Sequence, residues 1–187
     1  EKIINYLDEK NGSFKGAPKF PQFYLFDAMF YFYLKTGNEK YFKPVETLLF
    51  NISSKGMYDH LSGGIARYTV DENWIIPHFE KMLYDNIQFI NLLNKFYQKT
   101  KDIYYKNKLE QTITFINNEF KNDLGLYGSA YDAESDGVEG KYYVWNYKEL
   151  EQLIKDENLD IFEIGKIEVN KSSRCTISWK NYKLLFS

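Results

Sequence analysis

Apolar residues recur every three to four positions over several long segments of this chain, which is the spacing of one buried helix face. The aromatic stripe of Phe23, Phe26 and Phe30 is one example. Long helices are predicted over Pro21–Thr36, Glu39–Ser54, Pro77–Lys99 and from Asp102 to about Phe120. Shorter helices are predicted at Glu1–Glu9 and from Asn146, which forms a capping box with Glu149, to about Asp156. The chain is therefore predicted to be all-α.

The connections between the predicted helices alternate between long and short. The short ones lie at Gly37 and at Thr100–Lys101. The long, glycine-rich ones are Asn11–Phe20, Lys55–Ile76 and Lys121–Trp145, the last with a strand-like piece at Lys141–Trp145. In antiparallel helical hairpins, successive connections fall at opposite ends of the bundle. We therefore expect the three long loops at one end, where scaffolds commonly keep function.

Composition excludes several classes of protein. The 187 residues are 44% hydrophobic and 27% charged, with a net charge of −2, so the chain can bury a core but has no electrostatic footprint for nucleic acid. No basic run indicates a membrane surface, and no apolar stretch approaches the roughly 18 residues of a membrane span. The single cysteine, Cys175, fits a reducing compartment, so we expect a cytoplasmic protein.

The two ends of the chain bear on its domain organisation. The sequence begins at Glu1 without a methionine or a visible signal peptide, which indicates a fragment of a longer protein. Residues 1–165 are expected to form one helical domain. Residues 166–187 have no clear period and are expected to be an atypical tail, which the family resemblance described below implies is truncated or misread.

Both histidines of the chain lie in the stretch Met57–Asp85. In the predicted central helix, His78, Lys81 and Asp85 are spaced i, i+3 and i+7, so they share one face, and Glu80 lies in the first turn. Because histidine titrates near neutral pH, His78 is a candidate general acid or base, with Glu80 and Asp85 as catalytic carboxylates. The alternative is that His78 only hydrogen bonds a loop carbonyl.

The loop before that helix supplies further candidates. His60 is a second candidate acid or base. The guanidinium of Arg67 offers a planar fork of donors to a ligand, or else clamps the loop to Asp71 or Asp85. Most aromatic side chains are expected to pack helices; the alternative is that they form a rigid wall for a sugar or another ring. The substrate-binding candidates of this stretch are Asp59, Arg67, Trp74 and Tyr84.

An acidic segment, D-A-E-S-D-G-V-E, begins at Asp132. It matches a calcium-binding loop only loosely, because Tyr143 stands where that loop needs a bidentate glutamate. Asp132 and Glu134 are instead candidate substrate-binding carboxylates at the mouth of a cleft, or part of a solvated acidic turn. The spacing of His60, His78 and Glu80 matches no standard metal site, and no cofactor fingerprint is present, so neither a metal nor a cofactor is predicted.

Three segments together resemble a known family. They are Tyr58–Asn86, Y-D-H-L-S-G-G-I-A-R-Y-T-V-D-E-N-W-I-I-P-H-F-E-K-M-L-Y-D-N; Gly16–Pro21, G-A-P-K-F-P; and Asp132–Trp145, D-A-E-S-D-G-V-E-G-K-Y-Y-V-W. They are similar to motifs of the thioredoxin-domain-containing family of YyaL-like and spermatogenesis-associated protein 20-like proteins. The resemblance covers about Asn11–Leu150.

The resemblance implies a fold and partners. Such proteins carry a thioredoxin-like domain followed by a helical toroid of the six-hairpin (α/α)₆ type, similar to sugar epimerases and some glycoside hydrolases. Residues 1–165 would be part of that toroid, with short β pieces in the long loops. No C-x-x-C occurs in this chain, so the redox chemistry of a thioredoxin-like domain is not carried over. The expected partners are the remainder of the toroid and that domain.

Three functional hypotheses remain open at this point. The first is a cavity for a carbohydrate-like small molecule, with epimerase-like proton transfer by His78 and His60, an electrostatic contact from Arg67, and hydroxyl binding by Asp132 and Glu134. The second is a non-catalytic interaction module linked to a thioredoxin-like domain. The third is a glycoside hydrolase that pairs Glu80 or Asp85 with Asp132 or Glu134.

Overall fold

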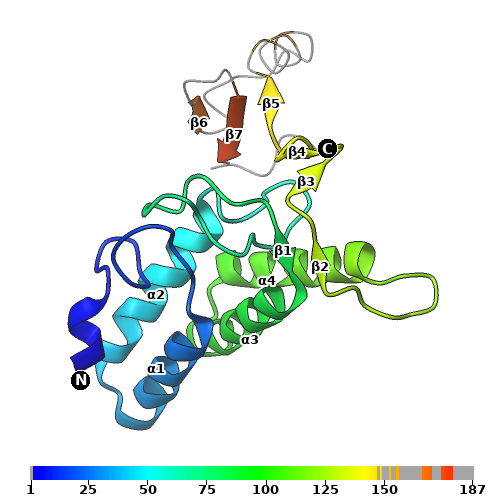
Figure 1. The fold of residues 1–187 in the computed structure, drawn as a ribbon. Helices are drawn as coiled ribbons and strands as arrows, with labels where there is room; N and C mark the ends of the chain where they lie inside the picture. The colour runs from blue at the N-terminus through cyan, green and yellow to red at the C-terminus, as the bar shows by residue number, and fades with distance from the viewer. Residues whose placement is uncertain are drawn as a thin grey trace.

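Antiparallel helices form the body of the protein, as the sequence predicts (Figure 1). The computed structural model describes residues 2–146, 148, 152, 155, 166–169 and 174–178. Its α-helices within that part are α1 (Phe23–Thr36), α2 (Glu39–Ser54), α3 (Leu83–Thr100) and α4 (Ile103–Phe115). A 3₁₀ helix at Lys2–Tyr6 precedes them, and α4 continues into a π-helical segment, Ile116–Phe120. The all-α fold class is confirmed.

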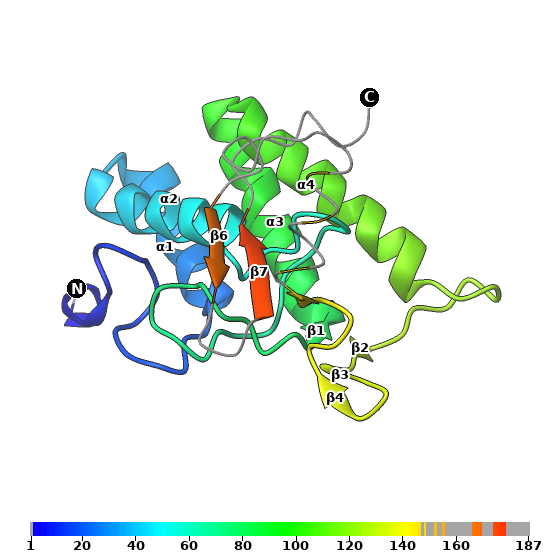
Figure 2. The ribbon, with the colours of Figure 1, turned by 90° about the horizontal axis from the view of Figure 1, so that it is seen from above.

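The helices form two hairpins whose tight turns are explained by local sequence. The first turn uses Gly37 in the left-handed region (φ 66°), and the Asn38 side chain accepts a hydrogen bond from the Lys40 N–H at the start of α2. In the second turn, Asp102 caps α4 by accepting from the Tyr104 N–H at 2.9 Å. Helix α3 packs against both α1 and α4, so it lies between these two helices and joins the two hairpins (Figure 2).

An aromatic and aliphatic core lies between α1, α2 and α3. Phe30 of α1 and Phe96 of α3 have ring centroids 5.7 Å apart, and Phe96 stacks on Phe42 of α2 at 5.2 Å. Leu48 and Leu49 of α2 are fully buried beside them. Most aromatic side chains of this region therefore pack helices, as expected. No helix of the described residues has the length and apolar character needed to cross a membrane.

The three long loops meet at one end of the helices, which confirms the expectation from their alternation. The backbones of Lys19 and Thr69 exchange two hydrogen bonds, which join the first loop to the second. The second loop leads into β1 (Lys81–Met82), which pairs antiparallel with β2 (Ala130–Tyr131) of the third loop. These contacts join the three loops; in Figure 1 the second loop, in green, lies above the helices, and β2 of the third loop lies beside β1.

The predicted start of the central helix is wrong. Helix α3 begins at Leu83 and not at Pro77; Pro77 instead forms a β-bridge with Thr69, and Lys81–Met82 form β1. The backbone groups between them bond to loops: the His78 N–H donates to the Tyr68 carbonyl at 3.0 Å, and the Glu80 carbonyl accepts from the Arg67 N–H at 2.8 Å. His78, Lys81 and Asp85 therefore do not share a helix face, and Glu80 is not in a first helical turn.

The acidic segment of the third loop forms a tight β-hairpin. Strands β3 (Glu134–Ser135) and β4 (Val138–Glu139) pair across Asp136 and Gly137, whose φ angles of 52° and 72° suit a two-residue turn. The segment therefore does not adopt a calcium-binding helix–loop–helix.

Farther along the chain, β5 (Trp145–Asn146) pairs with β7 (Arg174–Ser178), which pairs with β6 (Lys166–Val169). Of the strand-like piece predicted at Lys141–Trp145, only its last residue is in a strand. Most of the helix predicted from Asn146 to Asp156 lies outside the described residues, and the domain division at residue 165 stays a prediction.

Gly56 marks a close backbone approach between the two ends of the second loop. A Cβ at this position would lie 1.9 Å from the Ile75 carbonyl oxygen. We expect Gly56→Ala to lower the free energy of unfolding by about 1–3 kcal/mol, because the backbone has to move to accept the methyl group. Urea denaturation measures this change. Gly128→Ala is the matched control, because its nearest contact would be 3.8 Å and its stability should match the wild type.

Candidate functional site

Two adjoining cavities lie at the loop end of the molecule, with volumes of about 310 and 340 Å³. Their walls share five residues: Asp59, Ser62, Lys81, Tyr142 and Tyr143. We call this feature the paired cavity. The second and third loops supply these residues, together with β1, so the meeting of the loops creates the site. Each volume falls at the lower end of the roughly 300–1,000 Å³ of small-molecule sites.

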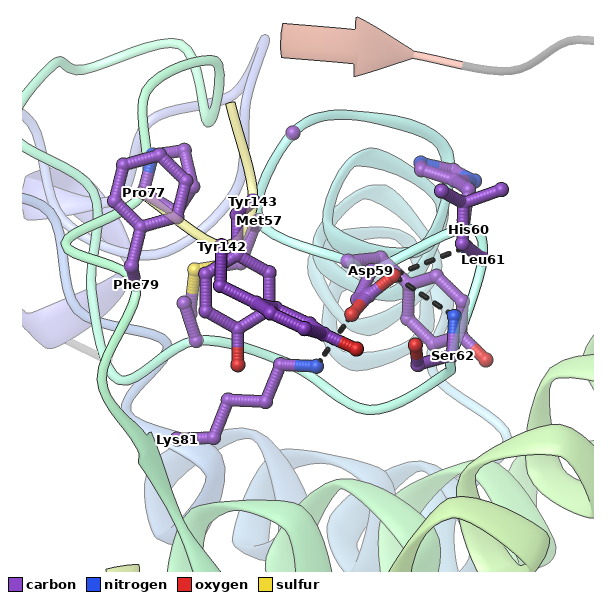
Figure 3. Close-up of a pocket in the computed structure, with 13 residues that line it drawn as sticks. Met57, Asp59, His60, Leu61, Ser62, Pro77, Phe79, Lys81, Tyr142 and Tyr143 are labelled. Carbon is purple, nitrogen blue, oxygen red and sulfur yellow. Dashed lines mark hydrogen bonds and ion pairs between the residues drawn. The ribbon is translucent and has the colours of Figure 1, made fainter. Parts of the chain in front are cut away.

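The centre of the shared wall is an ion pair between Lys81 and Asp59 (Figure 3). The Lys81 Nζ lies 2.6 Å from the Asp59 Oδ2 and also donates to the Gly63 carbonyl at 3.0 Å. The other carboxylate oxygen of Asp59 accepts the backbone N–H groups of Leu61 and Ser62. Both charged groups are therefore held by several hydrogen bonds, and the loop backbone fixes the orientation of the carboxylate.

Lys81 is 3% exposed, so its ammonium is almost fully removed from water. The Nζ lies 4.2 Å from the ring centroid of Phe115 and 5.1 Å from that of Tyr143. Burial lowers the pKa of Lys81, and the charge and hydrogen bond of Asp59 oppose that shift. The wall thus presents a desolvated amine beside a carboxylate.

Aromatic rings form much of the remaining wall. Phe79 stacks on Tyr143 with an interplanar angle of 10° and ring centroids 5.5 Å apart. The backbone of Phe79 is left-handed (φ 53°), a conformation that a right-handed helix does not contain, so α3 cannot extend back through this residue. A Cβ on Gly140 would meet the Phe79 ring at 2.6 Å, so glycine is needed there for the ring to approach. Tyr142 is 73% exposed at the edge of the cavity.

His60 lines the first cavity, but both of its ring nitrogens are engaged. Its Nε2 lies 2.9 Å from the Lys55 carbonyl, which only accepts, so Nε2 carries the proton. Its Nδ1 then accepts from the Lys108 Nζ at 3.4 Å. Burial and the charge of Lys108 lower the pKa of His60 to about 4, whereas the hydrogen bond to Lys55 and the charge of Asp59 act in the opposite direction. His60 is therefore neutral near pH 7.

A second polar cluster forms at the start of α3, among residues that line neither cavity. Arg67 and Glu80 form an ion pair at 3.1 Å, so Arg67 is clamped to Glu80 and not to Asp71 or Asp85. The Arg67 Nε and the Asp85 Oδ2 are buried without a hydrogen-bond partner. Burial raises the pKa of Asp85 to about 6, although Tyr84 and Arg67 lower it. Glu80, Asp85, Arg67 and Tyr84 are thus brought together, apart from the paired cavity.

His78 lies outside both the paired cavity and the polar cluster at the start of α3. Its Nδ1 lies 2.8 Å from the Glu139 Oε1, which links the second loop to β4. Its ring stacks on Tyr68 at 4.6 Å, and Tyr68 stacks in turn on Phe20 of the first loop. His78 is not among the residues that line either cavity, so it joins the loops beside the site.

The remaining candidates divide between cavity and core. Asp132 and Glu134 line the second cavity, where their side chains are exposed. Trp74 is fully buried, and its indole N–H donates to the Asn11 carbonyl at 2.7 Å, so it anchors the first loop to the second. No three His, Cys, Asp or Glu side chains within the described part of the chain gather as a metal ion would require.

Four members of the shared wall were not singled out as site residues from the sequence: Ser62, Lys81, Tyr142 and Tyr143. The sequence places Lys81 only on a predicted polar helix face and the two tyrosines only in a strand-like piece. The available signal was the density of polar and aromatic residues in the two long loops expected at one end. It did not reveal which side chains converge.

Comparisons with known proteins place the chain among relatives. It is 33% identical to spermatogenesis-associated protein 20 of Mus musculus over 160 residues, which are 80% of this chain and 20% of that protein. The human protein is 32% identical over 167 residues, 83% of this chain and 21% of that protein. An uncharacterized protein of Caenorhabditis elegans is 30% identical over 82% of this chain and 23% of its own length. The chain therefore spans about a fifth of the length of these relatives.

One solved structure shares the fold. The crystal structure of a sugar epimerase from a ruminal bacterium superposes with a TM-score of 0.58 at 16% sequence identity, covering 72% of this chain and 40% of that chain. At this identity the similarity concerns the fold alone. A comparison with models of known protein families finds no match.

Proposed function

The chain belongs to the family of the spermatogenesis-associated protein 20 proteins, and from this premise we propose that its paired cavity binds a carbohydrate-like small molecule. The observation that carries the proposal is the shared wall, in which Tyr142 and Tyr143 lie beside the ion pair of Asp59 and Lys81. Aromatic faces provide rigid area for the C–H surfaces of a sugar ring, and charged groups hydrogen bond its hydroxyls. The second cavity adds Asp132 and Glu134 as acceptors.

The proposal is also supported by the fold shared with the sugar epimerase. A reaction of the epimerase class needs groups that exchange a proton with the substrate. In the paired cavity, Asp59 and Lys81 are the charged pair on the shared wall, whereas His60 has both ring nitrogens engaged. We therefore propose Asp59 and Lys81, and not His78 or Asp85, as the residues that contact the reacting part of a ligand.

Binding of unmodified sugars by the full-length protein tests this proposal. Saturation-transfer NMR with a panel of neutral mono- and disaccharides identifies a ligand, and calorimetry measures its dissociation constant. Tyr143→Leu removes a ring from the shared wall and should weaken binding about tenfold, the loss of roughly 1.4 kcal/mol of contact energy. Tyr24→Leu is the matched control: Tyr24 is 69% exposed on α1, away from the paired cavity, and binding should be unchanged. Absence of binding across the panel by a folded protein contradicts the proposal.

The interaction-module hypothesis is favoured by a different observation. Helix α1 exposes large apolar side chains on its outer surface, each at least half accessible: Tyr24, Tyr31, Phe32 and Leu34. Exposed apolar patches commonly mark contacts with other protein surfaces. If no sugar binds and substitution of Tyr31 by Ser abolishes association with the remainder of the protein, this second hypothesis takes precedence.

A further inference from the structure

The amine of Lys81 is placed as a reactive amine would be, and not only as a structural cation. Lys81 lines both cavities, so its amine borders the space where a ligand would lie. The Nζ is surrounded by the Asp59 carboxylate at 2.6 Å, the Gly63 carbonyl at 3.0 Å and the rings of Phe115 and Tyr143. A lysine that only tied β1 to the second loop would not need a cavity on either side of it.

Burial makes the neutral amine, which is the nucleophilic form, easier to reach than in an exposed lysine, although Asp59 opposes this shift. Burial lowers the pKa of Lys81, since the rings of Phe115 and Tyr143 replace water around the ammonium. Desolvated lysines of this kind act as nucleophiles toward carbonyl compounds in other enzymes. Asp59 supplies the second requirement, a fixed carboxylate in contact with the amine that can take and return a proton.

We propose that Lys81 forms a reversible imine with the carbonyl group of an aldehyde or ketone ligand, such as the open-chain form of a reducing sugar. This inference rests on the proposed function, because the paired cavity has to admit the sugar. It goes beyond that function by naming the reacting atom, the Nζ of Lys81, and the chemical class of the ligand, a carbonyl compound.

The step balances with groups already present. Asp59 accepts a proton from the Lys81 ammonium, and the free amine adds to the carbonyl carbon to give a carbinolamine. The carbon–oxygen bond of the carbinolamine then breaks, and its hydroxyl leaves as water after Asp59 returns the proton. The product is a protonated carbon–nitrogen double bond between ligand and lysine, with Asp59 again a carboxylate and no change in oxidation state. Hydrolysis reverses each step, so no further reactant is needed.

A second buried lysine helps to show what is specific about Lys81. Lys108 is also buried, and burial lowers its pKa to about 8. Its Nζ lies 3.4 Å from the His60 Nδ1 and 3.9 Å from the ring centroid of Tyr58, and its residue lines neither cavity. Lys108 is therefore an internal control: it is a buried lysine with a lowered pKa but without access to the proposed ligand.

Reductive trapping tests the inference on the unmodified full-length protein. The protein is incubated with glyceraldehyde, a short sugar with a free carbonyl, and sodium cyanoborohydride, which converts an imine into a stable secondary amine. Peptide mass spectrometry then locates the adduct. We expect Lys81 to be modified before exposed lysines such as Lys95, and Lys108 to stay unmodified. An excess of a sugar found to bind should suppress the Lys81 adduct only.

Two variants separate reaction from folding. Asp59→Asn keeps the side chain's shape but removes the proton acceptor, and it should slow trapping at Lys81 while the protein still melts cooperatively. Lys81→Arg retains a cation and should lose the adduct. Adducts on exposed lysines alone, or sugar binding without any Lys81 adduct, would overturn the imine while leaving the proposed function standing. Neither binding nor adduct in a folded protein would overturn both.

Discussion

Lys81→Met is expected to lower the free energy of unfolding by about 3–5 kcal/mol, the usual loss when one partner of a buried ion pair is removed. The Asp59 side chain is only 13% exposed, so its carboxylate would stay buried without its cation. The Gly63 carbonyl would lose the same donor. Methionine fills a similar volume, so the loss reports the charge and the hydrogen bonds and not a cavity. Urea denaturation at neutral pH measures it.

An exposed ion pair provides the matched control. Lys95 and Asp27 are also 2.6 Å apart, but their side chains are 47% and 41% exposed. Lys95→Met should therefore cost no more than about 1 kcal/mol. The double variant Asp59→Asn, Lys81→Met should be more stable than the sum of the two single losses predicts, because it leaves no buried charge without its partner. If Lys81→Met is as stable as the wild type, Asp59 is not held by this pair and the account of the shared wall is wrong.

The second large effect is a pair of opposing pH dependences. The pKa of His60 is lowered from 6.5 to about 4 in the folded chain, so between these values the unfolded chain binds more protons and acidification destabilises the fold. The pKa of Asp85 is raised from 3.8 to about 6, so in nearly the same range the folded chain binds more protons and acidification stabilises it. Each pKa shift corresponds to a change of roughly 3 kcal/mol in the free energy of unfolding.

Two variants separate these contributions. Asp85→Asn removes the stabilising response, so this variant should lose about 3 kcal/mol more than the wild type between pH 6.5 and 4. His60→Gln retains a donor for the Lys55 carbonyl and an acceptor for Lys108, and it should gain stability relative to the wild type over the same range. Denaturation curves at several pH values supply the comparison. Identical pH profiles for all three proteins would show that neither group is as buried as the structure places it.

Local sequence was sufficient to predict most of the helical framework. Helix α2 has the predicted bounds, and α1 ends at Thr36 as expected, because Gly37 and Asn38 act on the turns next to them. The alternation of long and short connections also placed the three loops at one end. The helix ends depend on neighbours within a few residues, and the placement of the loops follows from the order of long and short connections. Both can therefore be predicted from the sequence alone.

The start of α3 depended on distant partners and was mispredicted for that reason. Pro77 suits a first helical position, and the apolar spacing continues through it. In the folded chain, however, the Leu83 N–H donates to the Ser129 carbonyl, and Lys81 pairs with Tyr131, some fifty residues along the chain. Hydrogen bonds to another loop thus replace the helical ones, and no local pattern records them.

The same division applies to the candidate site. From the sequence alone it followed that Asp59, His60, Asp132 and Glu134 lie in loops that meet, and the structure places all four around the paired cavity. Only the tertiary structure decided that Lys81 is part of the shared wall, whereas Glu80 and Asp85 lie with Arg67 at the start of α3. The direction of each of these side chains depends on where β1 ends and α3 begins. That boundary is set by pairing between loops, so the sequence determined which segments build the site and the fold determined which atoms face one another.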